Sequence, residues 1–85
     1  MNRRRLLRRL LRGALRNVSF DDFVSLVEGF GFQLVRVSGS HHLFAHPDTS
    51  GPINLQSVRS EAKPYQIRQF LRIVERHNLK LEDER

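Results

Sequence analysis

The chain has 85 residues, which is enough for one small domain, and its 39% hydrophobic and 28% charged residues are typical of a folded protein rather than a disordered one. It contains no cysteine, which excludes disulfides, thiolate metal sites and cysteine nucleophiles and fits a reducing compartment. Of the net charge of +6, residues 1–17 contribute seven arginines and no acid, whereas residues 18–85 hold eight bases and nine acids, so a uniformly basic surface is excluded.

The N-terminal segment, residues 1–17, has the pattern of a basic amphipathic helix. Its apolar residues recur with helical spacing on one side, while the arginines occupy the other. These apolar residues are Leu6, Leu7, Leu10, Leu11, Ala14 and Leu15. Four uses stay open: packing on the rest of the chain or on a partner, a solvated arm, attraction to RNA, and contact with a membrane surface or a targeting function. No apolar run approaches the roughly 18 residues that span a bilayer, so we expect a cytoplasmic protein without a membrane role.

A first helix of the main domain is predicted over residues 19–28. Ser19 is a suitable N-cap, and acids follow it at the positive end of the helix dipole. Helical spacing is kept by Phe20, Phe23, Val24 and Val27. We expect Gly29 to end the helix in a left-handed conformation.

Three strands follow, as an antiparallel meander. Residues 32–37 are aromatic and β-branched, and 38–40 are a Ser-Gly-Ser turn into a second strand at 41–46. The Pro-flanked segment 47–52 is a loop, and residues 53–56 alternate apolar and polar as a third strand does.

A second helix is predicted over residues 64–77, where Pro64 suits the first turn. Its apolar stripe consists of Ile67, Phe70, Leu71 and Val74. The resulting α-β-β-β-α order predicts an α+β fold in which both helices pack on one face of a three-stranded antiparallel sheet. The opposite face or an edge is then left for function.

Three of the four histidines lie between Gly39 and Pro47. On a strand, His42 and His46 share a face but lie about 13 Å apart, and His41 points to the other face, so a shared metal ion is not expected. Two interpretations stay open for these histidines. They are structural residues of a half-buried strand, or one of them exchanges protons beside a flexible turn that a phosphate can approach.

Several short motifs occur in a fixed order: Gly-Ser-His at 39–41, Phe44, His-Pro at 46–47, Glu-Ala-Lys at 61–63, and Tyr-Gln-Ile-Arg-Gln-Phe-Leu at 65–71. In this order the chain resembles the HicA family of mRNA interferase toxins over about residues 19–81. The resemblance implies a fold like that of double-stranded-RNA-binding domains and a ribonuclease activity on mRNA that stops translation. It also implies neutralisation by a HicB-type antitoxin. A cofactor or metal is not expected.

The resemblance places the family's catalytic histidine on His41, with His42 as the alternative. RNA supplies its own nucleophile, the 2′-hydroxyl, so a histidine that moves a proton is sufficient chemistry, and cations would hold the phosphate. The residues expected to contact RNA are Gly39, Ser40, Arg36, Arg59, Lys63, Arg68 and Arg72. For the arginines of the second helix, a solvated charged face is the competing interpretation.

The chain departs from the family pattern after the third strand. Many members carry a proline and a further histidine there, where this chain has Leu-Gln-Ser-Val-Arg at 55–59. Two alternatives therefore stand beside the nuclease: a non-catalytic RNA-binding module of the same fold, and a protein-interaction domain that uses the leucine face of residues 6–15. The predicted organisation is an arm at 1–17 and a HicA-like domain at 18–85.

Overall fold

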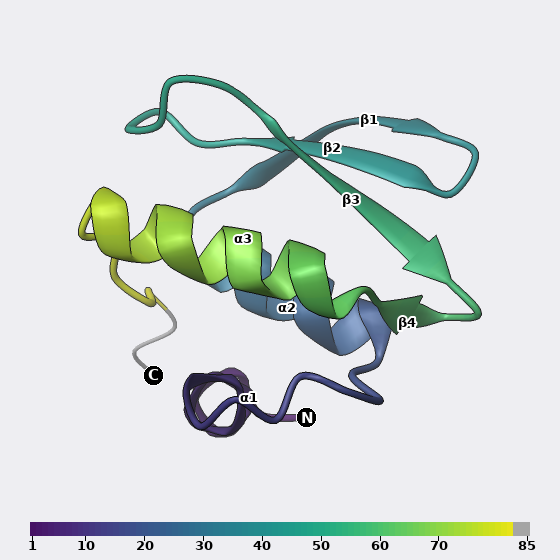
Figure 1. Cartoon of the computed structure of the whole chain (residues 1–85). Coiled ribbons are helices and arrows are strands. Elements are labelled where there is room, and N and C mark those ends of the chain that lie inside the picture. The colour runs from purple at the N-terminus through teal and green to yellow at the C-terminus, as the bar shows by residue number, and fades with distance from the viewer. Residues whose placement is uncertain (83–85) are drawn as a thin grey trace.

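The computed structural model describes residues 1–82, in which the chain forms three helices and four strands. In chain order these are α1 Arg3–Leu11, α2 Phe20–Gly29, β1 Gln33–Ser38, β2 His41–Ala45, β3 Ile53–Val58, β4 Glu61–Ala62 and α3 Pro64–Arg76. The strands form one antiparallel sheet in the order β1-β2-β3-β4. Helices α2 and α3 cover one face of the sheet, and α1 lies on the far side of this helix pair (Figure 1).

The architecture confirms the predicted α+β fold resembling double-stranded-RNA-binding domains, with both main helices within one residue of their predicted bounds. The prediction of three strands was incomplete, because the chain reverses after β3 and adds the two-residue strand β4. Arg59 and Ser60 make this reversal with positive φ angles of 53° and 65°, the signs that a type I′ hairpin turn requires. The Asn-Gly or Gly-Gly dipeptide typical of such turns is absent here, so the sequence carries no signal for this hairpin.

The ends of α2 show one confirmed cap and one wrong prediction. Ser19 Oγ accepts a hydrogen bond from the N–H of Asp22 at 3.3 Å, as an N-cap does. The left-handed residue beyond the helix is Gly31, with a φ of +96°, and not Gly29. Gly29 instead allows close packing, since a Cβ built on it would lie 2.8 Å from Leu81 Cδ1 and 3.0 Å from Arg3 Cδ.

The core lies between the sheet and the helices and is centred on Phe70 of α3. The Phe70 ring makes edge contacts with the rings of Phe23, Phe30 and Phe32, at centroid distances of 5.5, 5.6 and 5.7 Å. From the sheet, Phe44, Ile53 and Leu55 are buried on the same side. With one face of the sheet committed to this core, the other face is left to solvent.

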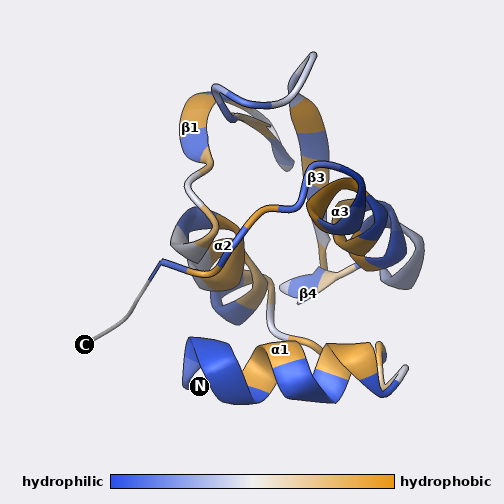
Figure 2. Cartoon of the chain, turned by 90° about the vertical axis from the view of Figure 1, so that its left-hand side faces the viewer, coloured by the Kyte–Doolittle hydropathy of each residue, from blue (hydrophilic) through white to orange (hydrophobic). Residues whose placement is uncertain are grey.

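The N-terminal helix α1 is part of the fold. Leu6 and Leu10 are 1% and 2% exposed and belong to the same core as α2 and α3. Asn2 caps the helix by accepting the N–H of Arg5 at 3.0 Å, and Arg3 Nε donates to Ser25 Oγ of α2 at 2.9 Å. Figure 2 shows the alternating hydrophobic and hydrophilic residues of α1 beneath the α2–α3 pair.

Of the four uses considered for residues 1–17, the structure shows packing on the body. The predicted leucine stripe is only partly used, because α1 ends at Leu11 and Gly13 turns the chain with a φ of +90°. Ala14 and Leu15 therefore lie beyond the helix, where Ala14 is exposed and Leu15 still packs against the core. Leu11, at 66% exposed, faces solvent.

Candidate active site

The face of the sheet that points away from the helices carries a row of mostly polar side chains. Strand register pairs His41 with Ser38 of β1 and with Gln56 of β3, and it pairs Leu43 with Arg36 and Asn54. Because side chains alternate along a strand, the neighbouring residues Phe44 and Leu55 point to the core. The first histidine of the pair therefore shares the outer face with residues of both flanking strands.

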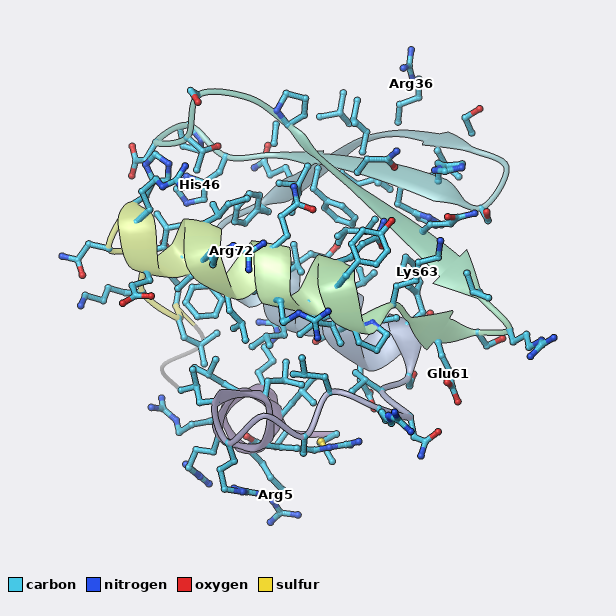
Figure 3. All side chains as sticks on the ribbon, in the orientation of Figure 1. Arg5, Arg36, His46, Glu61, Lys63 and Arg72 are labelled. Carbon is cyan, nitrogen blue, oxygen red and sulfur yellow. The ribbon has the colours of Figure 1, made fainter. Side chains whose placement is uncertain are left out.

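A small pocket of about 80 Å³ opens on this outer face. It is lined by Arg36, Ser38, His41, Leu43 and Asn54, and Arg36 is the one cation among these lining residues. Figure 3 shows Arg36 pointing away from the sheet on the side opposite the helices. An exposed imidazole and a guanidinium thus line one concavity that a phosphate group can approach.

The amide of Asn54 holds the His41 ring. Its Nδ2 lies 3.2 Å from Nδ1 of His41, so the side-chain contact fixes the ring from β3 and leaves Nε2 directed elsewhere. An amide can present either its NH₂ group or its oxygen after a half-turn about its Cβ–Cγ bond. Asn54 can therefore accept from Nδ1–H as well as donate to a bare Nδ1.

The turn that precedes His41 is tied to β3. Gln56 Nε2 donates to Ser40 Oγ at 3.3 Å, and the N–H of Ser57 donates to the Ser40 carbonyl at 3.1 Å. Gly39 has a φ of +61°, and a Cβ built on it would meet no atom within 4 Å. The turn is thus anchored at Ser40 but open at Gly39.

His42 points to the opposite face from His41. Its ring packs against Phe20 of α2 at a centroid distance of 4.9 Å, and it is half-buried. Its Nδ1 lies 3.2 Å from the Ser40 carbonyl, and since a carbonyl only accepts, Nδ1 donates the hydrogen. These contacts are those of a structural histidine beneath the sheet.

His46 is held at both ring nitrogens. Nδ1 accepts the N–H of Asp48 at 3.0 Å, so the neutral ring carries its proton on Nε2, which donates to the Phe30 carbonyl at 3.0 Å. The ring also packs against Phe32 at 4.9 Å (Figure 3 labels His46 between the sheet and α3). Nε2 therefore joins the end of β2 to the end of α2, and Nδ1 holds the loop that follows β2. Within residues 1–82 no three His, Asp or Glu side chains come together as a metal site would require.

The predicted cations are not gathered at one place. Arg36 lines the His41 pocket, whereas Arg59 and Lys63 line a separate pocket of about 330 Å³ together with Glu61. The Lys63 ammonium lies 5.6 Å from the centroid of the Tyr65 ring. Arg68 and Arg72 are exposed on α3, on the helical side of the sheet.

Sequence reasoning missed Ser38, Asn54 and Gln56 as neighbours of His41. Asn54 and Gln56 are the polar positions of the alternating third strand, so that pattern placed them on one face. Assigning them to the face of His41 requires the β2–β3 register, which the sequence does not state.

Comparison with known families identifies the class of protein. The family model for the HicA toxin of bacterial toxin–antitoxin systems matches residues 20–75, from the first turn of α2 to the last turn of α3. The chain therefore belongs to this family, as its motifs predict. It is a toxin of a toxin–antitoxin system, and its family implies an RNA substrate and an antitoxin partner. No curated protein and no solved structure matches it. No helix within residues 1–82 is long and apolar enough to cross a membrane.

Proposed function

We propose that this toxin is a metal-independent endoribonuclease that cuts mRNA in the cytoplasm, with His41 as its general acid and base. The observation that supports the proposal is the exposed His41 imidazole on the open face of the sheet, held by Asn54 and sharing a pocket with Arg36. His42 and His46 are occupied by contacts with the core side. His41 is therefore the histidine best placed to meet a substrate.

The reaction needs no cofactor, because the nucleophile belongs to the RNA. The 2′-oxygen attacks the adjacent phosphorus, a new O2′–P bond forms, and the P–O5′ bond breaks. One proton leaves the 2′-hydroxyl and one arrives at the 5′-oxygen, so the products are a 2′,3′-cyclic phosphate and a 5′-hydroxyl. General acid or base catalysis by one positioned histidine contributes on the order of 10²–10⁴-fold.

Asn54 and Arg36 have supporting roles in this chemistry. When the Asn54 oxygen faces His41, Nδ1 keeps a hydrogen and Nε2 is free to take the proton of the 2′-hydroxyl. The resulting imidazolium can then protonate the leaving oxygen. Arg36 offsets the negative charge that develops on the phosphate.

The turn and the outlying cations would contact the rest of the substrate. Gly39 leaves its backbone accessible, which allows the phosphate chain to pass close to the turn at Ser40. Arg59, Lys63, Arg68 and Arg72 lie off the face of His41, so in this proposal they contact only nucleotides that flank the cleaved bond.

The antitoxin is proposed to be of the HicB type and to dock along the β1 edge of the sheet. Strand β1 is an edge strand, and its large apolar side chains are exposed: Leu34 48%, Val35 61% and Val37 49%. An edge strand with exposed apolar residues offers backbone and side-chain contacts to a partner. Docking there would place the partner beside Arg36 and the His41 pocket.

The test is cleavage of a single-stranded RNA by the purified protein in EDTA. We expect the unsubstituted protein to cut and to leave cyclic-phosphate ends, and we expect His41→Ala to reduce the rate at least 100-fold. His42→Ala serves as the matched control, with circular dichroism to verify its fold. Cleavage that survives His41→Ala would overturn the assignment, and loss only in His42→Ala would move it to the alternative histidine.

A second candidate function is RNA binding without cleavage. It is favoured by the composition of the pocket, because its lining residues besides His41 are Arg36, Ser38, Leu43 and Asn54, which include no second acid or base of the usual kind. This candidate predicts RNA binding by the unsubstituted protein with no product at any incubation time.

A further inference from the structure

We propose that exposed arginines of α1 and of its C-cap form a second RNA-contact surface, separate from the His41 pocket, that binds the phosphate backbone of RNAs longer than about ten nucleotides. This surface, the α1 arginine face, consists of Arg5, Arg8 and Arg12. The proposal relies on the proposed function only in taking RNA as the ligand.

The fold fixes the α1 arginine face in one orientation. Leu6 and Leu10 bury the opposite side of the helix in the core, so α1 does not rotate about its axis. Arg5, Arg8 and Arg12 are spaced by three and four residues, which places them on successive turns of one side with a pitch of about 5.4 Å. All three are exposed. Figure 3 shows Arg5 pointing away from the body below α1.

These charges have no partner within the described part of the chain. No acid occurs before Asp21, and in residues 1–82 the one ion pair joins the Met1 amino group to Asp22 at 3.1 Å. The guanidinium groups of Arg5, Arg8 and Arg12 take part in none of the hydrogen bonds of these residues. Like charges three and four residues apart repel one another in a helix. The α1 arginine face therefore does not serve folding, and an external polyanion would neutralise it.

The His41 face offers few cations for binding RNA. Its pocket contains one cation, Arg36, and residues 18–85 have nearly balanced charges. Binding to a nucleic-acid backbone draws its strength from several cation–phosphate contacts. Arginine, with its planar fork of donors, suits phosphate oxygens especially well. The α1 arginine face would therefore add cation–phosphate contacts to those near the site. It lies outside the part matched by the family, which begins at residue 20.

Position makes this contribution depend on RNA length. Arg36 and Arg5 lie on opposite sides of the molecule, with the helix pair between them. The Cα extents are 31 × 28 × 23 Å. At about 3.4 Å per nucleotide of a stacked strand, a straight line of this length corresponds to about nine nucleotides, and the path around the protein surface is longer, so bridging takes more than about ten. Only a longer RNA can engage both surfaces, and its affinity is then raised by the linkage.

The experiment measures binding of 5- and 20-nucleotide RNAs of one repeated sequence by fluorescence anisotropy, with the His41→Ala protein as the background so that nothing is cut. The probe variant is Arg5→Gln/Arg8→Gln/Arg12→Gln. For the 20-mer we expect affinity to fall on the order of 100-fold at 0.1 M salt, and the slope of log K against log salt to become shallower by about 2. The preference for the longer RNA should disappear.

The matched control is the triple substitution to lysine. It keeps the positive charge and should therefore retain the preference for the longer RNA. Thermal unfolding of both variants verifies that they are folded. Unchanged 20-mer affinity in the glutamine variant would overturn the proposal. So would an equal loss for both RNAs, because bridging requires a length effect. If the glutamine variant kept RNA binding but lost an acidic partner protein, the surface would belong to that partner. Failure of the unsubstituted protein to cleave RNA would contradict the nuclease proposal, but it would not affect the result on RNA binding by the α1 arginine face.

Discussion

His41 and His42 are adjacent in the chain and have different surroundings, because successive side chains of a strand point to opposite faces. His41 meets Asn54 on the outer face, and His42 meets Phe20 beneath the sheet. The two residues are chemically identical, so the difference in their surroundings comes from their positions in the strand pairing. A shift of β2 by one residue would exchange their places.

Substitution of Asn54 tests whether the amide orients His41. Asn54→Ala removes one hydrogen bond to a neutral ring, so we expect the single-turnover cleavage rate to fall about 5- to 10-fold with little change in fold. The ¹⁵N shifts of the His41 ring should also show a changed distribution of its proton. Gln33→Ala, another exposed amide of the sheet, is the control and should have no effect on either quantity. An unchanged rate together with unchanged ring shifts would contradict the role of Asn54.

Two glycines with positive φ should respond differently to substitution. At Gly31 an added Cβ would lie 3.0 Å from Nε2 of His46, which is already bonded to Phe30, whereas at Gly39 it meets nothing within 4 Å. Gly39→Ala should cost about 1 kcal/mol, the penalty of a left-handed residue, and Gly31→Ala about 2–4 kcal/mol. Urea unfolding measures both. Equal losses of unfolding free energy would mean that the His46 ring moves away from the added methyl group without an energetic penalty.

Among the elements, α1 shows how tertiary contacts stabilise a short helix. A nine-residue helix with five arginines is marginal in isolation. Burial of a leucine side chain contributes about 1.5–3 kcal/mol, and α1 buries Leu6 and Leu10 against the body. Packing therefore outweighs the repulsion among its charges.

Truncation of single leucines in α1 tests this contribution. Leu10→Ala should lower the free energy of unfolding by about 2–4 kcal/mol, because it leaves a cavity in a closely packed core. Leu11→Ala, next in the chain but mostly exposed, should change it by less than about 0.5 kcal/mol. Chemical denaturation gives both values. Similar small changes in the two variants would show that α1 is detached in solution.

The elements that could be predicted from the sequence are those with their own local signals. Helix α2 has Ser19 as its cap and a regular apolar stripe, and α3 has Pro64 and the stripe around Phe70. Strand β4 has neither, since Glu61 and Ala62 become a strand by pairing with Val58 and Ser57 across the turn and with the segment before α2. The use of α1 stayed open for a similar reason, because an amphipathic pattern does not say which surface it will cover.

The same limit applies to the candidate site. The Gly-Ser-His turn was visible because its members are consecutive, and it indicated His41. The contact of His41 with Asn54 joins residues 13 positions apart and depends on the β2–β3 register. The pairing of Arg36 with Leu43 likewise follows a register shift within β1, between Leu34 and Arg36. Such contacts are set by three-dimensional pairing, which no short motif encodes.

On the scale of the whole molecule, a single core joins the sheet, the helix pair and α1. Small domains with one core usually unfold in one cooperative transition. We therefore expect the backbone amide of Leu10 in α1 to exchange with deuterium at an opening free energy within about 1 kcal/mol of that of Phe70 in α3. Hydrogen exchange followed by NMR measures both. Much faster exchange at Leu10 would show that α1 opens separately.

The layered arrangement has a practical consequence for handling the protein. The N end lies beside α1 in Figure 1, and Glu82 is bonded to Gly29 at the end of α2, so both ends of the described chain are on the helical side of the sheet. An affinity tag or a fluorescent fusion joined beyond Glu82 would therefore start from the side of the molecule opposite the imidazole. A tag at the amino end would lie close to the α1 arginine face. It would therefore disturb measurements of RNA binding by that face more than measurements of cleavage.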